Sequence, residues 1–377
     1  MAKQATGIAS ALDAMEKAGF DVDNRATGEA PPVIPTAFDH FNTMLKCGGI
    51  PRRRYTQIFG EPHQGKTLLA MHIATMAQKQ DPDRLVLYMD TENTFDRAWA
   101  ELNGLDFSKL YLVQGNTAEV VYEQTLLAMK TGKVGVVIID TIGHLIEEKG
   151  KTASWKTEEA EVKRDGGKRQ VGASQKLTAR FCRTASDLMV EHDIAMIGVN
   201  QTYTAIGVLY GDPLVTPGGK SWKFSITMDI HVRNAGYIRD SKTSPVTGMK
   251  MALDIRKNKL GGPAKTDDDT QLQFYFGKDG ISRAITYGLI DRAVRLGIIT
   301  IANNTWFDWS WNGEQVRKWQ GRARVVAELM REEELREQLH DLVVAQEKLQ
   351  SGRSNSNIPT TTSGDLEDSA LSGDEES

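Results

Sequence analysis

The sequence predicts an α/β fold with a mostly parallel, twisted sheet, and three observations lead to this prediction. Between about residues 34 and 275, short apolar runs alternate with helical stretches, a pattern typical of βα units. One of these runs leads through the glycine-rich turn GEPHQGKT into a helical stretch. The chain has 377 residues with 40% hydrophobic content, enough for a large core and two or three domains. The expected strands are YTQIF, RLVLYM, KLYLV, VGVVIID and IAMIGVN.

The N-terminal segment, residues 1–33, is expected to be an arm outside the core. The stretch ASALDAMEKAGF has helical spacing and a stop at Gly19, and DVDNRATGEAPPVIP then resembles a linker. The segment has no apolar signal core, and no run approaches the roughly 18 apolar residues of a membrane span. The cysteines, Cys47 and Cys182, lack metal-ligand spacing and suit a reducing compartment. We therefore expect a cytoplasmic protein that is not associated with a membrane.

The C-terminal part divides into two segments. Residues 280–350 look helical and carry tryptophans, so we expect a separate small domain there. Residues 351–377 are rich in Ser, Thr and Gly, and from residue 354 onward they hold six acids and no Lys or Arg. This composition predicts a disordered acidic tail. The tail either keeps the protein soluble or competes with phosphates for a basic site elsewhere in the chain.

The stretch GEPHQGKT has the spacing and the flanks of a phosphate-binding loop. Gly60 is followed by four residues and then by Gly65, Lys66 and Thr67, between a strand-like and a helix-like stretch. Backbone N–H groups would wrap a phosphate at the helix N-terminus, Lys66 would meet the outer phosphates, and the Thr67 hydroxyl would ligate Mg²⁺. An ordinary glycine turn is the structural alternative. The predicted cofactors are ATP and Mg²⁺, contacted by Gly60, Glu61, Pro62, His63, Gln64, Gly65, Lys66, Thr67 and Leu68.

Two acids follow expected strands and complete the chemistry of such a loop. Asp140 ends the run GVVIID, and strand C-termini face the ligand in parallel sheets, so we predict that Asp140 orients the metal. Glu92 follows the run LVLYMD and is the candidate base that orients the attacking water. The alternatives are an N-cap role for Asp140 and a cap or solvated charge for Glu92.

Several motifs resemble, in order and spacing, the ATPase core of the RecA family of strand-exchange recombinases over residues 34–345. They are GGIPRRRYTQIFGEPHQGKT, YMDTENTFDRAWAELNGLD, VVIIDTI, NQTYTAIGVLYGDP, PGGKSWKF, IRKNKLGGP and GLIDRAVRLGII. The details NQTY and IDTIG also resemble phage-encoded recombinases of the UvsX type. The resemblance implies a polymerisation arm at 1–33, a RecA-type P-loop ATPase core with two DNA-binding loops at 34–279, and a small C-terminal α+β domain at 280–350.

The same resemblance assigns roles to residues of the ATPase core. It implies that Glu92 is the catalytic carboxylate, that Asp140 is associated with Mg²⁺, and that Gln201 senses the γ-phosphate. It implies that Trp99 stacks on adenine and that Asp96 contacts the base, although a lone Trp is more often part of the core.

A pair of lysines forms a further element of the predicted active site. Lys257 and Lys259 alternate on the strand-like stretch DIRKNK, so both should point to one face. The resemblance places that face against the ATP of a neighbouring copy, as a catalytic contribution in trans. The alternative is an exposed edge strand protected by its lysines.

Two segments are implied to bind DNA, residues 147–172 and the loop after Gln201. Between Lys149 and Lys176 we count eight basic residues against four acids, a balance that suits a phosphate backbone, although a charge run is more often a solvated face. The second segment carries no Lys or Arg between Gln201 and Lys220, so tyrosines that stack on bases would have to replace them. The candidate DNA contacts are Lys168, Arg169, Val171, Lys176, Arg183, Tyr203, Ile206, Tyr210, Gly218, Gly219 and Lys220.

Taken with the resemblance, these features predict an ATP-dependent homologous recombination protein. We expect a helical filament of this chain on single-stranded DNA, which pairs that strand with homologous duplex and releases it on ATP hydrolysis. The expected partners are single-stranded DNA, duplex DNA, further copies of the chain, and single-strand-binding and loader proteins. Two alternatives stay open at this point: a filament-associated regulatory paralogue, and a hexameric helicase motor of the DnaB type.

Overall fold

A computed structural model describes most of the chain. The described residues are 14, 17, 18, 30–115, 117–145, 173–204, 214–239, 242–260, 271–277, 279–303, 305–311 and 313–355. Contacts between residues divide the chain into two units, Met1–Ile281 and Ser282–Ser377.

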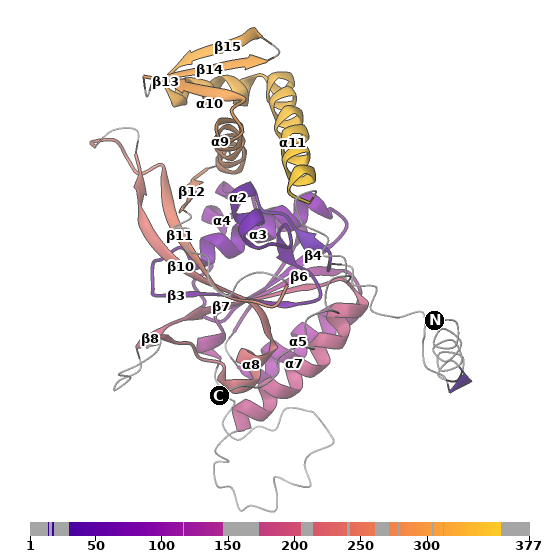
Figure 1. The fold of residues 1–377 in the computed structure, drawn as a ribbon. Coiled ribbons are helices and arrows are strands. Elements are labelled where there is room, and N and C mark those ends of the chain that lie inside the picture. Colours follow the sequence, from indigo (N-terminus) through magenta and orange to yellow (C-terminus); the bar gives the residue numbers. More distant parts are fainter. Residues whose placement is uncertain are drawn as a thin grey trace, which may run out of the picture. The chain divides into compact units, whose positions relative to one another are not determined.

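The first unit is built on an eight-stranded sheet with the order β12-β11-β10-β3-β7-β6-β4-β5 (Figure 1). The strands from β10 to β5 pair in parallel, whereas β11 and β12 are antiparallel additions at one edge. The predicted parallel sheet is therefore confirmed, and each of the five apolar runs forms a strand. The strands are β3 (Tyr55–Gly60), β4 (Leu85–Asp90), β5 (Leu110–Gln114), β6 (Val134–Asp140), β7 (Ala195–Gln201), β10 (Ile226–Ile238), β11 (Gly248–Asn258) and β12 (Gln271–Tyr275).

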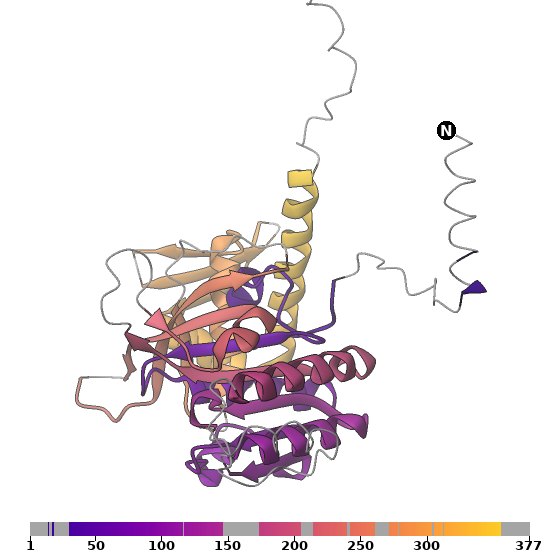
Figure 2. The ribbon, with the colours of Figure 1, turned by 90° about the horizontal axis from the view of Figure 1, so that it is seen from below.

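Helices cover both faces of this sheet (Figures 1 and 2). One face carries α2 (Asp39–Met44), α3 (Lys66–Gln80) and α4 (Arg97–Leu102), and the other carries α5 (Ala118–Lys130), α7 (Ala173–Glu191) and α8 (Gly219–Ser225). Coverage of both faces explains why the central strands are continuous apolar runs rather than alternating ones. Short elements complete the unit: β1 (Val33–Ile34) pairs with β2 (Ile50–Pro51), β8 (Tyr203–Thr204) pairs with β9 (Leu214–Val215), and two 3₁₀ turns are η1 (Phe107–Lys109) and η2 (Ile142–His144).

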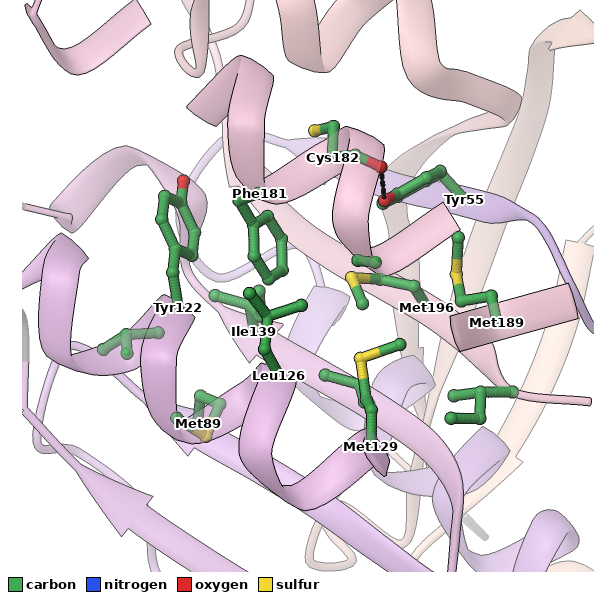
Figure 3. Close-up of a cluster of buried hydrophobic side chains, with 14 of the residues drawn as sticks. Tyr55, Met89, Tyr122, Leu126, Met129, Ile139, Phe181, Cys182, Met189 and Met196 are labelled. Atoms are coloured by element: carbon green, nitrogen blue, oxygen red, sulfur yellow. Dashed lines mark hydrogen bonds between the residues drawn. The ribbon is translucent and has the colours of Figure 1, made fainter. Parts of the chain in front are cut away.

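The core between the sheet, α5 and α7 is rich in methionine and aromatic side chains (Figure 3). The rings of Tyr122 and Phe181 stack with centroids 4.1 Å apart, joining α5 to α7. The Tyr55 hydroxyl donates to the Cys182 carbonyl at 2.7 Å, so the polar end of a buried aromatic side chain is satisfied. Cys182 is a free, buried cysteine that packs in this core.

On the other face of the sheet, a buried histidine holds α3 in place. His72 packs against the rings of Phe38 and Phe274, with centroid distances of 4.9 and 5.3 Å, and these two rings contact each other at 4.5 Å. Its Nε2 accepts a hydrogen bond from the Ala37 N–H at 3.1 Å. Burial lowers the pKa of His72 to about 3, because a charged ring would lose its water there. The helix α3 is thus fixed by a neutral imidazole.

The second unit combines helices with a small antiparallel sheet of order β13-β14-β15. Its elements are α9 (Gly280–Arg295, which begins in the first unit), β13 (Ile299–Ala302), β14 (Trp306–Trp311), β15 (Glu314–Gln320), α10 (Arg322–Arg331) and α11 (Glu333–Asn355). Trp309 is 1% exposed and lies 6.5 Å from the Trp319 ring, so it belongs to the core of this unit. The helix α11 continues past residue 351, where the sequence placed the start of the tail. Among the described helices, none is both long and apolar enough for a bilayer crossing.

Candidate active site

The predicted phosphate loop connects β3 to α3 at the carboxyl edge of the sheet. Gly60 cannot be replaced without a shift, because a Cβ there would lie 2.4 Å from the Val232 carbonyl oxygen of β10. Gly65 precedes the helix with φ of 91°, a left-handed conformation that favours glycine. The loop therefore needs glycine at both ends of its four-residue spacer, and α3 presents its N-terminal N–H groups there.

Lys66 lies inside this loop. Its side chain is largely buried, with 8% of the residue exposed, and Nζ donates to the Glu61 carbonyl at 2.7 Å. Burial lowers the pKa of Lys66, and the nearby charges of Asp140, Glu92 and Glu61 oppose that effect. An ammonium that is partly stripped of water and hydrogen-bonded to a carbonyl of its own loop is well placed to exchange that carbonyl for a phosphate.

Asp140 and Thr67 lie side by side at the ends of β6 and of the loop. The Thr67 hydroxyl donates to Asp140 Oδ2 at 2.8 Å, and the Tyr88 hydroxyl donates to the same oxygen at 2.7 Å. Burial raises the pKa of Asp140, and these two donors oppose the rise. The cap of the following turn is Thr141, whose hydroxyl accepts from the Gly143 N–H at 3.2 Å, so Asp140 is not the N-cap. A hydroxyl and a carboxylate at this spacing suit Mg²⁺, which prefers oxygen ligands.

Glu92 is contacted by two side chains at one of its carboxylate oxygens. Gln201 Nε2 lies 3.0 Å from Oε1, and His144 Nδ1 also lies 3.0 Å from Oε1. The turn after β4 is instead fixed by Asp90, which accepts from the Glu92 N–H at 3.2 Å and the Phe95 N–H at 3.0 Å. Glu92 is thus neither a cap nor a purely solvated charge. The sequence analysis gave no role to His144, which follows the motif VVIIDTI, or to Tyr88, which opens the motif YMDTENTFDRAWAELNGLD.

The phosphate loop, the Thr67–Asp140 pair and the Glu92–Gln201 pair therefore meet at one edge of the sheet. Residues 22–282 match the RecA N-terminal domain. The chain belongs to the RecA family. It is 31% identical to protein RecA of Thermus aquaticus over 84% of this chain and 87% of the relative. It is 28% identical to that of Aquifex pyrophilus over 90% and 93%, and 29% identical to that of Chloroherpeton thalassium over 81% and 78%.

The residues that the RecA resemblance assigns to adenine make structural contacts of their own. Asp96 caps α4, because its Oδ1 accepts from the Trp99 N–H at 2.9 Å. The half-buried Trp99 ring meets the edge of Phe276 with centroids 5.0 Å apart. Stacking of Trp99 on adenine and contact of Asp96 with the base stay predictions.

Lys257 at the end of β11 and Lys259 just after it point to the same neighbour. Lys257 Nζ donates to the Lys223 carbonyl at 2.8 Å, and Lys259 Nζ donates to the Phe224 carbonyl at 3.1 Å. Both acceptors lie in the last turn of α8, where helix carbonyls lack partners within the helix. Burial and the charge of Lys259 lower the pKa of Lys257, against the attraction of Asp229. Their expected position on one face is thus observed, and their role toward a neighbouring copy stays a proposal.

A buried polar network that the sequence analysis missed lies beneath α8. Gln57 of β3 accepts from Trp222 Nε1 at 2.7 Å and from Asn200 Nδ2 at 3.0 Å, and it donates to Asp229 Oδ1 at 2.9 Å. Asn200 also donates to the Pro217 carbonyl at 2.9 Å. Burial raises the pKa of Asp229 to about 6. The network joins α8 to β7, the strand that ends in Gln201.

The described DNA-binding candidates lie on α7, β8 and α8. Lys176 and Arg183 are exposed on α7, and their spacing of seven residues puts them on one face of the helix. Tyr203 in β8 is 53% exposed. Gly218 is the N-cap of α8, and Gly219 and the exposed Lys220 open the helix. Outside the described residues lie Lys168, Arg169, Val171, Ile206 and Tyr210.

Proposed function

We propose that this chain is a DNA-dependent ATPase that forms a helical filament on single-stranded DNA and pairs it with homologous duplex. ATP and Mg²⁺ would bind at the phosphate loop, with a neighbouring copy closing the site. The filament would bind the DNA backbone and align the strands, while hydrolysis would release the DNA. Strand exchange replaces base pairs by others of similar energy, so no covalent intermediate with the protein is needed.

The observation that supports this proposal most strongly is the hydrogen bond of 3.0 Å from Gln201 to Glu92. Glu92 is the candidate base for hydrolysis, and Gln201 begins the segment proposed to bind DNA. A base and a DNA-binding segment that share one hydrogen bond give a physical reason for turnover to depend on DNA. The γ-phosphate of ATP would compete with Glu92 for the Gln201 amide, which would move the start of that segment.

The remaining residues divide the work of phosphoryl transfer. Lys66 and the N–H groups of the loop would neutralise the phosphates, and Thr67 and Asp140 would hold the metal, directly or through water. The bound metal would supply charge neutralisation at the outer phosphates. Glu92 would orient the attacking water, and Lys257 and Lys259 would stabilise the charge that develops on the γ-phosphate bound to the adjacent copy.

ATP turnover with and without single-stranded DNA, paired with electron microscopy of the same mixtures, tests the proposal. We expect turnover that single-stranded DNA stimulates, together with helical filaments. Glu92→Gln should keep ATP and DNA binding, lower turnover by about 10²-fold to 10⁴-fold, and give persistent filaments. Full turnover in this variant would contradict the assignment of Glu92. Closed rings would favour the DnaB-type motor, and filaments that do not exchange strands would favour a regulatory paralogue.

A further inference from the structure

The surroundings of Glu92 contain a residue that none of the motifs explains. His144 lies in the turn η2, directly after β6, with Nδ1 3.0 Å from Glu92 Oε1. Gln201 donates to the same oxygen at 3.0 Å. Among the described residues, only these two side chains contact the Glu92 carboxylate through a hydrogen bond or an ion pair. Both contacts are at Oε1, so Oε2 is the oxygen that we expect to face the attacking water.

Three neighbouring strands bring these groups together. Glu92 follows β4, His144 follows β6 and Gln201 ends β7, and these strands are adjacent in the sheet order. Thr91 and Thr141 join the first two by a reciprocal pair of bonds: the Thr91 hydroxyl donates to the Thr141 carbonyl at 2.8 Å, and the Thr141 N–H donates to that hydroxyl at 2.7 Å. The backbone next to Glu92 is therefore fixed relative to the turn that carries His144.

The turn η2 is also held on its other side. A Cβ at Gly143 would lie 2.8 Å from Pro217 Cγ and 3.4 Å from Asn200 Oδ1, so the turn packs closely against these residues. His144 N–H donates to the Thr141 carbonyl at 3.3 Å. The imidazole is 48% exposed. The backbone of its turn is nevertheless anchored, by Thr91 next to β4 and by the close approach of Gly143 to Asn200 of β7. An anchored ring can position a carboxylate, whereas a long mobile side chain at the surface contributes little.

We propose that His144 is a positioning residue for ATP hydrolysis, which holds Glu92 in the orientation that activates water; this inference rests on the proposed function. The carboxylate accepts, so Nδ1 carries the proton in this contact. A carboxylate that rotates freely would present the correct oxygen to water for only part of the time. The loss of His144 should then slow hydrolysis and leave nucleotide binding unchanged.

The test compares His144→Phe, which keeps a ring of similar shape without a donor, with His144→Asn, which keeps a nitrogen donor near the position of Nδ1. We expect kcat on single-stranded DNA to fall about 10-fold in His144→Phe, with KM for ATP and the Kd for DNA unchanged, because one hydrogen bond to a charged group is lost at a partly exposed site. His144→Asn should recover kcat to within about threefold of the parent. Equal kcat in the parent and in His144→Phe would overturn the proposal.

A double-variant cycle separates positioning from general damage. In a Glu92→Gln background, His144→Phe should cause no further loss of turnover, because the group that it positions is already disabled. Independent, multiplicative losses would show that His144 acts elsewhere. If the parent protein has no DNA-stimulated turnover, the proposed function itself fails. If the parent is active, Glu92→Gln is stalled and His144→Phe is fully active, only the role of His144 fails.

Discussion

Lys66 and the Lys257–Lys259 pair both donate to main-chain carbonyls, but they do so at different depths of the molecule. Lys66 is 8% exposed and donates to Glu61 within its own loop. Lys259 is exposed, Lys257 is half-buried, and both donate to carbonyls of α8, an element remote in sequence. The first position is enclosed by the core of one chain, and the second lies at its surface.

The difference suggests a division of labour between binding and rate. The ammonium of Lys66 already lies inside the loop, next to the place where we expect a phosphate to bind. Lys257 and Lys259 instead cover the C-terminal carbonyls of α8, which carry partial negative charge. A phosphate from a neighbouring copy would be a stronger acceptor than these carbonyls. We therefore expect the two positions to fail in different ways when their charges are removed.

The double variant Lys257→Ala, Lys259→Ala should give the largest effect. If the pair stabilises the γ-phosphate in trans, as an arginine finger does, DNA-stimulated turnover should fall by roughly 10³-fold or more. ATP binding by isolated protomers should persist, because Lys66 and its loop are intact. Phosphate release on single-stranded DNA measures the first quantity, and titration of a fluorescent ATP analogue measures the second. Lys250→Ala, near the other end of β11, is the matched control and should be fully active.

Mixing the double variant with Lys66→Ala protein tests whether the two positions act in one shared site. The double variant has an intact phosphate loop, and Lys66→Ala protein has intact Lys257 and Lys259. A junction between them can hold a complete site, so at an ATP concentration too low to load the Lys66→Ala loop, a mixture should turn over more ATP than the two proteins do separately. Normal hydrolysis by the double variant alone would show that the site is not shared between copies.

Lys66→Ala should give a smaller effect on a different quantity. Affinity for ATP should weaken by about 10-fold to 100-fold, because one charge-assisted hydrogen bond to the phosphates is lost. Lys66→Met keeps most of the buried stem and separates the loss of charge from the loss of packing. Both variants should bind ATP with similarly reduced affinity in an equilibrium titration with Mg²⁺. Unchanged affinity in Lys66→Met would remove the loop from the nucleotide site.

The sequence predicts the parallel sheet and the phosphate loop well because both depend on local signals. Buried parallel strands are continuous apolar runs, and the loop is a contiguous motif between a strand and a helix. The stretch TWFDWSWNGEQVRKWQ looked helical by itself, although the RecA resemblance implied an α+β domain, and it contributes β14 and β15. The dipeptide NG in this sequence, which favours a hairpin, was the overlooked signal.

His144 and Gln57 escaped prediction for a different reason. The contact of His144 with Glu92 depends on β4 and β6 being neighbours, and strand order cannot be read from a pattern of apolar residues. Gln57 interrupts the apolar run of β3, which could have marked it as unusual. Its partners Asn200, Trp222 and Asp229 become visible only when three distant segments are brought together.

Acid should affect the stability of the phosphate-loop side and of the Lys257–Lys259 side in different ways. On the first side, the titrating group is His72, the buried histidine of α3. The pKa of His72 is lowered to about 3 from 6.5, so between these values the unfolded chain binds a proton that the folded chain does not. The free energy of unfolding is therefore unaffected by His72 above pH 6.5. Between pH 6.5 and about 3 it falls as the pH falls, by about 1.4 kcal/mol per pH unit. His72→Gln, whose amide oxygen can accept from Ala37, should reduce this loss. Denaturant unfolding of both proteins at pH 7.5 and 5.5 measures it, and parallel pH profiles would contradict the assignment.

Asp229, beside Lys257, should respond to acid in the opposite sense and more weakly. Its pKa is raised to about 6 from 3.8, so the folded chain binds the extra proton between these values, and stability rises as the pH falls through this range. Above pH 6 the ionised carboxylate costs stability, by about 1–2 kcal/mol, since the side chain is half-buried and solvent screens part of the effect. Asp229→Asn keeps an oxygen acceptor for Gln57 and removes the charge. It should therefore be more stable than the parent at pH 7.5, and the difference should shrink as the pH falls and vanish only below about pH 3.8, the unfolded pKa. If Asp229→Asn is instead less stable than the parent at pH 7.5, the attraction between Asp229 and Lys257 outweighs the cost of burying the carboxylate. The position of Lys257 then depends on the charged form of Asp229.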